Sequence, residues 1–409
     1  MDKQKEPRLR FKGFTGNWEE NVLEEVVNFF SGLTYSPNDV VKNGTLVLRS
    51  SNVQDNQITT EDNVFVKESA VNCQNVEVGD VIVVVRNGSR SLIGKHAIIK
   101  EKMPNTVIGA FMTGVRSNQP DFLNALLDSY KFNQEIEKNL GATINQITTG
   151  AFRKMEFSLP SLPEQTHLGL FFRHLDSQIA ESRAVLEKSR QLKKAMLAKM
   201  FPANGEKIPK IRFKGFEGEW ECRKLGEIGS TFGGLTNKSR EDFGHGDARY
   251  ITYMNVYQNA LSSEHQLDSI EIDVKQNEVK KGDVLFTTSS ETPEEVGMSS
   301  VWAFDINNVY LNSFCFGYRL NKQINLNYLA YCLRSDYIRS QMILLAQGIS
   351  RYNISKKGVM EIEILIPTAE EQTAIGNFFR QLDETIALQS AEVEKLNQLK
   401  KGLLAAMLV

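Results

Sequence analysis

The sequence predicts an α+β protein in which two similar domains are joined by two long helices. Three observations support this. Glu164–Ala184 (EQTHLGLFFRHLDSQIAESRA) and Glu371–Ala391 (EQTAIGNFFRQLDETIALQSA) share 12 of 21 residues at a constant offset of 207. Pro7–Trp18 (PRLRFKGFTGNW) returns as Pro209–Trp220 (PKIRFKGFEGEW), with 8 of 12 residues identical. Between these anchors, short β-rich runs separated by turns precede a helical stretch in each half, which is typical of an α+β domain.

The two anchoring segments at 160–201 and 367–408 are each predicted to form one long helix. Pro and Glu open both segments, and good helix formers fill their polar positions. Apolar residues recur at alternating spacings of four and three, which is the seam of a coiled coil. The seam residues are Leu168, Phe172, Leu175, Ile179 and Leu186 in the first helix, and Ile375, Phe379, Leu382, Ile386, Val393 and Leu396 in the second.

We expect the two helices to pair with each other as an antiparallel coiled coil within the chain. Polar interruptions of the seam fall at matching places, Ser182 with Gln389 and Lys193 with Lys400. Two alternatives remain: each helix could lie on its own domain, or pair with another subunit. Phe171 and Phe378 lie off the seam, so we expect them to contact the adjoining domain or a partner.

Four segments follow from the repeats: a domain at 1–159, a helix and linker at 160–208, a second domain at 209–366 and a helix at 367–409. Expected strands include 45–48, 81–85, 97–99, 284–288 and 314–320, followed by helices at 122–140 and 327–346 and closing strands at 154–159 and 360–366. The stretch Leu46–Ile58 has little in common with Tyr250–Ser262. The scaffold therefore repeats while part of its surface differs, as expected for loops that carry function.

Composition is ordinary for a globular protein, with 41% hydrophobic and 24% charged residues and a formal charge of −2. Net charge therefore neither favours nor excludes nucleic-acid binding, which would depend on local clusters. The four cysteines are far apart and form no C-x-x-C pair, which favours reduced thiols in a cytoplasmic protein. No long apolar run indicates a membrane span.

The FKGF-x-G-x-W openings, the G-L-T turns, the G-D-V strands and the repeated P-x-x-E-Q-T helices together resemble the specificity subunits of Type I restriction-modification systems over the whole chain. The resemblance implies two target-recognition domains, each reading one half of an asymmetric bipartite DNA sequence, with the helices setting the spacer. It implies two modification (methyltransferase) subunits as partners, with or without two restriction subunits. S-adenosylmethionine, ATP and Mg²⁺ would be used by those partners, and this chain would bind no cofactor.

Polar residues at two places in each domain are the candidates for DNA contact, because Arg, Lys, Asn, Gln, Ser and Thr can reach phosphates and base edges. One place follows the β run at 81–85 and its repeat, and the other precedes the closing strand. Solvated turns are the alternative interpretation. The candidates are Arg86, Asn87, Ser89, Arg90, Lys95, Thr143, Asn145 and Gln146 in the first domain, and Thr287, Thr288, Ser289, Ser290, Ser350, Arg351, Tyr352 and Asn353 in the second.

We find no set of residues that forms a catalytic site, so we expect a protein that is not an enzyme. The chain contains no Walker A motif and no Asn/Asp-Pro-Pro-aromatic motif of an adenine methyltransferase. Asp268, Glu278 and Lys280 are the best match to the acidic and basic residues of a nuclease site, but so short a pattern recurs by chance. His167 and His174 are better interpreted as surface residues than as metal ligands, because Ala374 and Gln381 replace them in the second copy. The alternatives are a self-contained restriction-modification enzyme and a purely structural adaptor.

Overall fold

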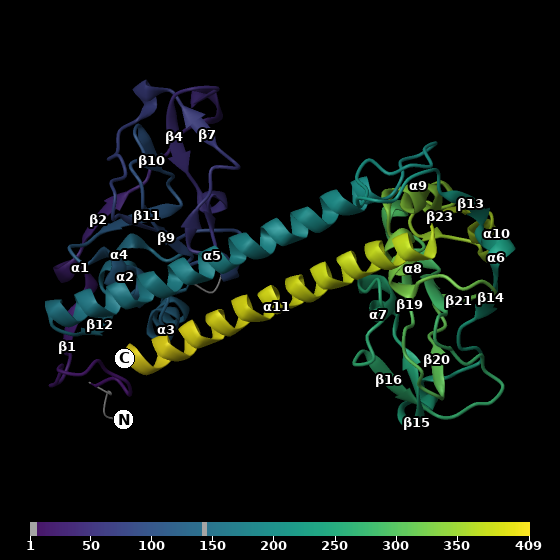
Figure 1. Cartoon of the computed structure of the whole chain (residues 1–409). Helices are drawn as coiled ribbons and strands as arrows, with labels where there is room; N and C mark the ends of the chain where they lie inside the picture. The colour runs from purple at the N-terminus through teal and green to yellow at the C-terminus, as the bar shows by residue number, and fades with distance from the viewer. Residues whose placement is uncertain (1–5, 141–144) are drawn as a thin grey trace. The chain divides into compact units, whose positions relative to one another are not determined.

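The computed structural model describes residues 6–140 and 145–409. The chain divides into two compact units: unit 1 comprises Met1–Arg183 with Ala391–Val409, and unit 2 comprises Ala184–Ser390 (Figure 1). Each unit therefore contains one α+β domain and one part of each long helix. The helices, which the sequence predicted as segments of their own, are each divided between the units.

Unit 1 is built on a four-stranded antiparallel sheet and a second sheet that contains one parallel pair. The first sheet has the order β2-β11-β8-β9, and the second has the order β10-β4-β7-β3 with β10 parallel to β4. Its strands are β1 (Glu19–Val22), β2 (Asn28–Ser31), β3 (Val40–Val41), β4 (Thr45–Leu48), β5 (Val53–Gln54), β6 (Gln57–Ile58), β7 (Val64–Val66), β8 (Val81–Val84), β9 (His96–Ile98), β10 (Thr106–Ile108), β11 (Met112–Arg116) and β12 (Glu156–Leu159). Its short helices are α1 (Leu23–Val26), α2 (Pro120–Leu127), α3 (Tyr130–Asn139) and α4 (Thr149–Arg153).

Unit 2 repeats this plan with a smaller second sheet. Its four-stranded sheet has the order β14-β21-β17-β19, and β15 lies between β16 and the parallel strand β20. Its strands are β13 (Glu221–Lys224), β14 (Gly229–Gly233), β15 (Phe243–Ile251), β16 (Leu267–Ile270), β17 (Val284–Thr287), β18 (Ser289–Ser290), β19 (Ser299–Val301), β20 (Val309–Leu311), β21 (Cys315–Leu320), β22 (Tyr352–Asn353) and β23 (Glu363–Ile366). Its short helices are α6 (Leu225–Ile228), α7 (Tyr253–Gln258), α8 (Leu326–Cys332), α9 (Asp336–Leu344) and α10 (Lys356–Met360).

The predicted helices at 122–140 and 327–346 are wrong as single helices. Each is two helices, α2 with α3 and α8 with α9, and a serine stands directly before the second helix of each pair. Ser129 accepts a hydrogen bond from the Phe132 N–H as the N-cap of α3, and Ser335 occupies the same place before α9. Serine favours such a break because its hydroxyl competes for backbone hydrogen bonds.

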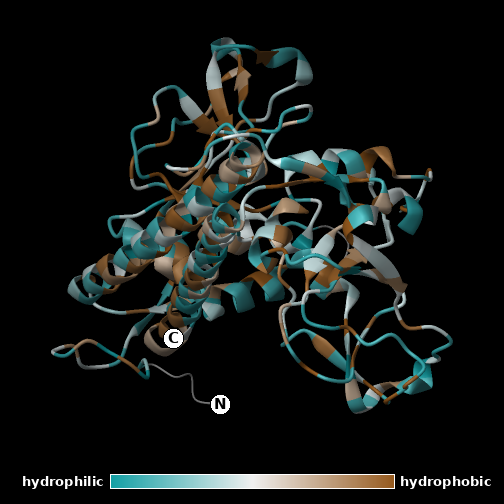
Figure 2. Cartoon of the chain, turned by 45° about the vertical axis from the view of Figure 1, so that its right-hand side comes forward, coloured by the Kyte–Doolittle hydropathy of each residue, from teal (hydrophilic) through white to brown (hydrophobic). Residues whose placement is uncertain are grey.

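The two long helices are α5 (Leu162–Met200) and α11 (Ala369–Met407), each of 39 residues. In Figure 2, hydrophobic residues recur between hydrophilic ones along both helices. Every predicted seam residue is buried or half-buried: Leu168, Phe172, Leu175, Ile179, Leu186, Ile375 and Phe379 are buried, and Leu382, Ile386, Val393 and Leu396 are half-buried.

Contacts inside each unit show that the helices run antiparallel. In unit 1, Leu168 near the start of α5 shares a core with Leu404 near the end of α11. In unit 2, Met200 at the end of α5 shares a core with Ile375 near the start of α11. The coiled coil predicted within the chain is therefore confirmed.

The matched lysines of the seam do not face each other as the sequence suggested. In unit 2, Lys193 forms an ion pair of 2.5 Å with Asp383. In unit 1, Lys400 pairs with Asp176 at 2.5 Å and with Asp128 at 2.6 Å. Asp176 and Asp383 are equivalent in the repeat, so the antiparallel arrangement gives each lysine the carboxylate of the opposite helix.

The repeated segments Pro7–Trp18 and Pro209–Trp220, called the FKGF segments below, each contact the ends of both long helices. One of the two contacts is a buried ion pair. Arg10 Nε and Nη2 donate to the two carboxylate oxygens of Glu164 at 2.7 Å each, and Nη1 donates to the Gly16 carbonyl at 2.6 Å. Glu164 lies in the first turn of α5 and is only 1% exposed. The neighbouring Leu9 N–H donates to the Ala406 carbonyl near the end of α11. One segment therefore fastens the start of α5 and the end of α11.

The second FKGF segment makes the same contacts in unit 2. Arg212 donates to both carboxylate oxygens of Glu371 at 2.7 Å, and the Ile211 N–H donates to the Lys199 carbonyl. In both units the hydrogen bonds to the glutamate are the largest cause that raises the pKa of the arginine guanidinium. The contacts explain why these motifs recur.

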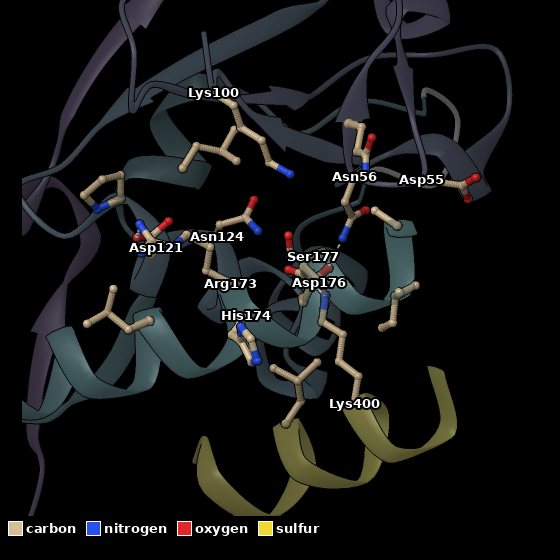
Figure 3. Close-up of a pocket in the computed structure, with 18 of the residues that line it drawn as sticks. Asp55, Asn56, Lys100, Asp121, Asn124, Arg173, His174, Asp176, Ser177 and Lys400 are labelled. Carbon is tan, nitrogen blue, oxygen red and sulfur yellow. Dashed lines mark hydrogen bonds and ion pairs between the residues drawn. The ribbon is translucent and has the colours of Figure 1, made fainter. Parts of the chain in front are cut away.

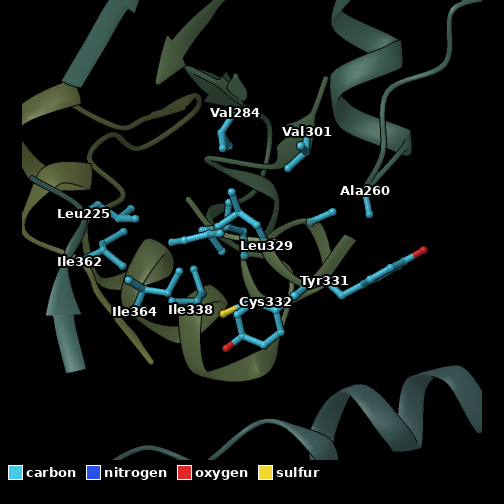
Figure 4. Packing of buried hydrophobic residues seen from close by; sticks show 14 of the residues in the cluster. Leu225, Ala260, Val284, Val301, Leu329, Tyr331, Cys332, Ile338, Ile362 and Ile364 are labelled. Atoms are coloured by element: carbon cyan, nitrogen blue, oxygen red, sulfur yellow. The ribbon is translucent and has the colours of Figure 1, made fainter. Parts of the chain in front are cut away.

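The phenylalanines off the seam pack on their own FKGF segments. Phe171 lies 5.6 Å from Phe11 and Phe378 lies 6.0 Å from Phe213, measured between ring centroids. The expectation that they contact the adjoining domain is therefore confirmed. In unit 2 this end of the helix pair joins the largest apolar core, which continues from the sheet through α8 and α9 (Figure 4).

We predict that Arg10→Ala lowers the free energy of unfolding of unit 1 by roughly 3–5 kcal/mol, because it leaves the buried Glu164 carboxylate without a partner. Adding Glu164→Gln should recover part of the loss by removing the unpaired charge. Lys12→Ala, at an exposed position two residues away, is the matched control. Thermal and denaturant unfolding measure the effect, and equal stability of the Arg10 and Lys12 variants would contradict a structural role for the pair.

Candidate nucleic-acid interface

The two candidate segments of unit 1, which lie far apart in the sequence, are adjacent in the structure. Arg86 forms an antiparallel backbone bridge with Gln146. The Asn87 N–H donates to the Asn145 carbonyl at 3.2 Å, and the Asn145 side-chain amide donates to the Gly88 carbonyl at 2.9 Å. Residues 86–90 and 145–146 are called recognition segment 1 below.

The side chains of recognition segment 1 differ in how firmly they are held. Arg86 is exposed, and its guanidinium carbon lies 4.9 Å from the centroid of the Phe111 ring. The Asn87 amide donates to the Ser50 hydroxyl at 3.0 Å and its carbonyl oxygen accepts the Ser89 N–H at 3.0 Å. The Ser89 hydroxyl lies 2.9 Å from that of Ser91. Arg86 is therefore free to bind a partner, whereas Asn87 has a structural function in the turn.

The remaining basic residues of unit 1 border the same segment. Arg90 pairs with Glu137 at 2.5 Å, and both side chains are more than half exposed. Such a surface pair is weak, so Arg90 can exchange Glu137 for a phosphate at little cost. Lys95 is half-buried and lines a groove of about 560 Å³ with Ser50, Ser51 and Gln54. Thr143 lies outside the described residues.

Unit 2 places its candidate segments side by side at the equivalent position. Strand β18 pairs with β22, so that Ser289 lies opposite Asn353 and Ser290 lies opposite Tyr352. The Ile354 N–H donates to the Thr288 carbonyl at 3.0 Å, as the Ile147 N–H does to Val85 in unit 1. Residues 288–290 and 350–353 are called recognition segment 2 below.

Most of the candidate residues 287–290 are buried. Thr287 is the last residue of β17 and fully buried, and its hydroxyl accepts the Met298 N–H at 2.9 Å. Ser289 and Ser290 are buried in the short strand β18, and Thr288 is half-buried. The strand continues because the second segment supplies a partner for it. Ser350, Arg351 and Asn353 are exposed and Tyr352 is half-buried, so the accessible polar groups of this segment come from its second half.

Two stacked tyrosines that the sequence did not single out lie in unit 2, and one of them contacts recognition segment 2. Tyr253 donates its hydroxyl to the Ser289 carbonyl at 2.9 Å, and its ring stacks on Tyr257 at 6.0 Å between centroids. Tyr257 donates to Glu295 at 2.5 Å, and this hydrogen bond is the largest cause that raises the pKa of the Tyr257 hydroxyl. Both tyrosines belong to the stretch 250–262 that diverges from 46–58, where Ser50, Ser51 and Gln54 stand in unit 1. The divergence itself was the signal that could have identified them.

A cavity of about 1060 Å³ lies in unit 1, lined by α2 and by parts of α5 and α11 (Figure 3). The Lys400 ammonium is held there by Asp128 and Asp176, and Asp128 also accepts the Asn56 amide at 2.6 Å. Burial alone lowers the pKa of Lys400, but the two carboxylates outweigh it and raise the pKa overall. Burial raises the pKa of Asp176, and Lys400 offsets only part of that shift. Lys400, Asp128 and Asp176 thus hold α11 against α5 and the end of α2.

The two carboxylates considered for catalysis accept hydrogen bonds within unit 2. Asp268 accepts the Tyr250 hydroxyl at 3.2 Å, and Glu278 accepts the Asn308 N–H. His167 and His174 are exposed, as expected of surface residues. Among residues 6–140 and 145–409, no group of three or more His, Cys, Asp or Glu side chains could hold a metal ion. No helix within the described part of the chain is long and apolar enough to cross a membrane.

Comparisons with known proteins identify the family. The family described as Type I restriction modification DNA specificity domain matches this chain twice, over residues 15–188 and 217–398. The specificity subunit of the Type I restriction enzyme EcoKI from Escherichia coli (strain K12) is 25% identical over 412 residues, which cover 95% of this chain and 88% of that protein. The putative Type I restriction enzyme MjaX specificity subunit from Methanocaldococcus jannaschii is 24% identical over 415 residues, covering 96% and 93%.

A solved structure shows the same fold over the whole chain. The crystal structure of the Type I restriction-modification S subunit from M. genitalium aligns with a TM-score of 0.61 at 14% identity and covers 99% of both chains. The two family matches together span most of the sequence, one in each half. This chain therefore belongs to the Type I restriction-modification specificity family, whose members are non-catalytic subunits that recognise DNA, and it carries two recognition domains.

Proposed function

We propose that each unit reads one half of an asymmetric bipartite DNA target. The observation that supports this is a shared backbone arrangement with different side chains. Arg86, Asn87 and Gln146 in unit 1 correspond to Ser289, Ser290 and Asn353 in unit 2, because Val84 and Thr287 pair with equivalent residues of β11 and β21. Arg86 is exposed at its position, whereas Ser289 and Ser290 are buried and unit 2 presents Arg351 and Asn353 from the second half of its segment. The two units therefore place their accessible hydrogen-bonding groups differently, and groups placed differently meet different base edges. Two similar surfaces with unlike side chains are suited to two unlike half-sequences.

The long helices, in this proposal, set the distance between the half-targets and dock two modification subunits. Each helix of 39 residues spans about 58 Å at ~1.5 Å per residue. This exceeds the ~34–36 Å that separates successive turns of B-DNA. The exposed polar faces of α5 and α11 leave room for partner subunits along their length.

The chemistry belongs to the partner subunits. Modification subunits would use S-adenosylmethionine to methylate adenine, and restriction subunits, where present, would use ATP and Mg²⁺. This chain would bind none of these cofactors and would act in the cytoplasm. The two relatives above are both named as specificity subunits, which supports this division over a self-contained restriction-modification enzyme.

One experiment distinguishes a specificity subunit from a self-contained restriction-modification enzyme. The purified chain, mixed with DNA, Mg²⁺ and labelled S-adenosylmethionine, should transfer no methyl group until a modification subunit is added. Methyl transfer by the chain alone would overturn the proposal. A purely structural adaptor would restore methylation without any preference for sequence.

We predict that Arg86→Ala with Arg90→Ala relaxes the choice of one half-target and leaves the other half unchanged. Arg351→Ala should relax only the opposite half. A lost bidentate contact to a base lowers discrimination by roughly 1–3 kcal/mol, or about 5- to 150-fold. Mapping methylated adenines after incubation of each assembled complex with a random-sequence DNA library measures both effects.

The same mapping contains its own control. If the double arginine variant weakened both halves equally, these arginines would bind phosphates without reading bases. Because the two variants lie in different units, each serves as the matched control of the other.

We predict that inserting seven residues after Ser182 and after Gln389 lengthens the unread spacer and keeps both half-sequences. The two insertion points are equivalent and fall within a few residues of the boundary between the units in each helix, so each unit stays intact. One heptad preserves the seam and adds roughly 10 Å, or up to about three base pairs at ~3.4 Å each. An unchanged spacer in an active complex would mean that other parts of the complex set the distance.

A further inference from the structure

One exposed aromatic residue stands at the same place in both units. Phe111 is 53% exposed and Phe314 is 61% exposed. Each is the third residue of a tight turn, closed by the Met112 N–H to the Gly109 carbonyl at 2.9 Å in unit 1 and by the Cys315 N–H to the Asn312 carbonyl at 3.3 Å in unit 2. Exposed apolar residues are common singly, but these two occupy equivalent positions in two diverged domains.

Both phenylalanines are fixed directly beside the recognition segments. The Phe111 carbonyl accepts the Val85 N–H at 3.0 Å and the Arg86 N–H at 3.2 Å. The Phe314 carbonyl accepts the Thr288 N–H at 3.0 Å. These bonds hold each ring on a short turn next to the residues that we expect to contact DNA.

The surroundings of the rings favour DNA over an apolar protein surface. The Arg86 guanidinium lies over the Phe111 ring. In unit 2, the exposed Arg351 directly precedes β22, the strand that pairs with β18 next to Thr288. In such a site the cation can contact a phosphate while the ring contacts an adjacent base. Phenylalanine also inserts between base steps in several proteins that bend DNA.

We propose that Phe111 and Phe314 are aromatic wedges that each insert at a base step of their half-target. This inference rests on the proposed function. A phenyl ring donates and accepts no conventional hydrogen bond, so it can contact many base steps and cannot by itself choose a sequence. This explains why the same residue stands in both units while the neighbouring polar residues differ. The wedges supply affinity and local unstacking, and the recognition segments supply the choice of bases.

Two alanine variants test the proposal in the complex assembled with modification subunits. Phe111→Ala and Phe314→Ala should each weaken binding to the target duplex on the order of tenfold, which is within the range for loss of one aromatic contact to a base. The preferred half-sequences should not change. Tyr130→Ala, at an aromatic side chain of α3 that is 69% exposed, is the matched control and should bind like the wild type.

A fluorescent base reports the insertion itself. With 2-aminopurine placed in turn along each half-target, away from the methylated adenine and without S-adenosylmethionine, the wild-type complex should increase the fluorescence at one step per half. Phe111→Ala should abolish the increase in its own half only. Phe111→Leu should retain it, because leucine also acts as a wedge.

Three results would overturn the inference. Unchanged affinity and fluorescence in the alanine variants would mean that the rings do not insert. Loss of subunit assembly at unchanged DNA affinity would place the rings in a protein interface. If Phe111→Leu were as defective as Phe111→Ala, the ring would act only by orienting Arg86. Failure of the proposed function is distinguishable, because the wild-type complex would then select no bipartite target.

Discussion

The structure depends on one buried contact that is made twice, the pair of an FKGF-segment arginine with the first-turn glutamate of a long helix. Arg10 with Glu164, and Arg212 with Glu371, each combine two charge-assisted hydrogen bonds with two bonds from the arginine to backbone carbonyls. The neighbouring backbone bonds to Ala406 and Lys199 join the end of the other helix to the same segment. Each domain is thereby fixed to both helices. A recognition domain must be fixed in this way if the helices are to determine where it lies.

Antiparallel pairing explains how a duplicated sequence produces two closed units. Each unit receives the first part of one long helix and the last part of the other, so both units contain the same set of contacts. Two ion pairs show this directly: Lys193 with Asp383 in unit 2, and Lys400 with Asp176 in unit 1. The two lysines are equivalent in the repeat, and so are the two aspartates.

One position shows where the two units depart from this symmetry. Asp128 precedes the N-cap Ser129, and Arg334 precedes the equivalent Ser335. Asp128 extends the ion pair of Lys400, whereas Arg334 donates to carbonyls that include those of Ser299, Val256 and Asn259. Burial lowers the pKa of Arg334 to about 10. The scaffold thus tolerates opposite charges at one position, because each is satisfied by its own surroundings.

The sequence predicted the parts of the fold that depend on local pattern and repetition. The helices, the seam, the domains and the strand Thr45–Leu48 follow from periodicity, and the repeat identified the places of both recognition segments. It did not predict that Ser289 and Ser290 are buried, because their strand β18 depends on a partner more than sixty residues away. The same reason applies to Lys400, which looked like a mismatch in a seam until the antiparallel arrangement supplied Asp176. Phe111 and Phe314 were not singled out, because the exposure of a phenylalanine depends on how its turn packs and cannot be predicted from local pattern.

The most direct test of the account is the set of adenines that the wild-type complex methylates. Single-molecule sequencing of DNA methylated by this chain with its modification subunits should give one consensus with two short, unlike half-sequences and a gap of fixed length with no base preference. Such a result would agree with two similar scaffolds that carry different recognition segments. A palindromic consensus, or a continuous target without a gap, would contradict it.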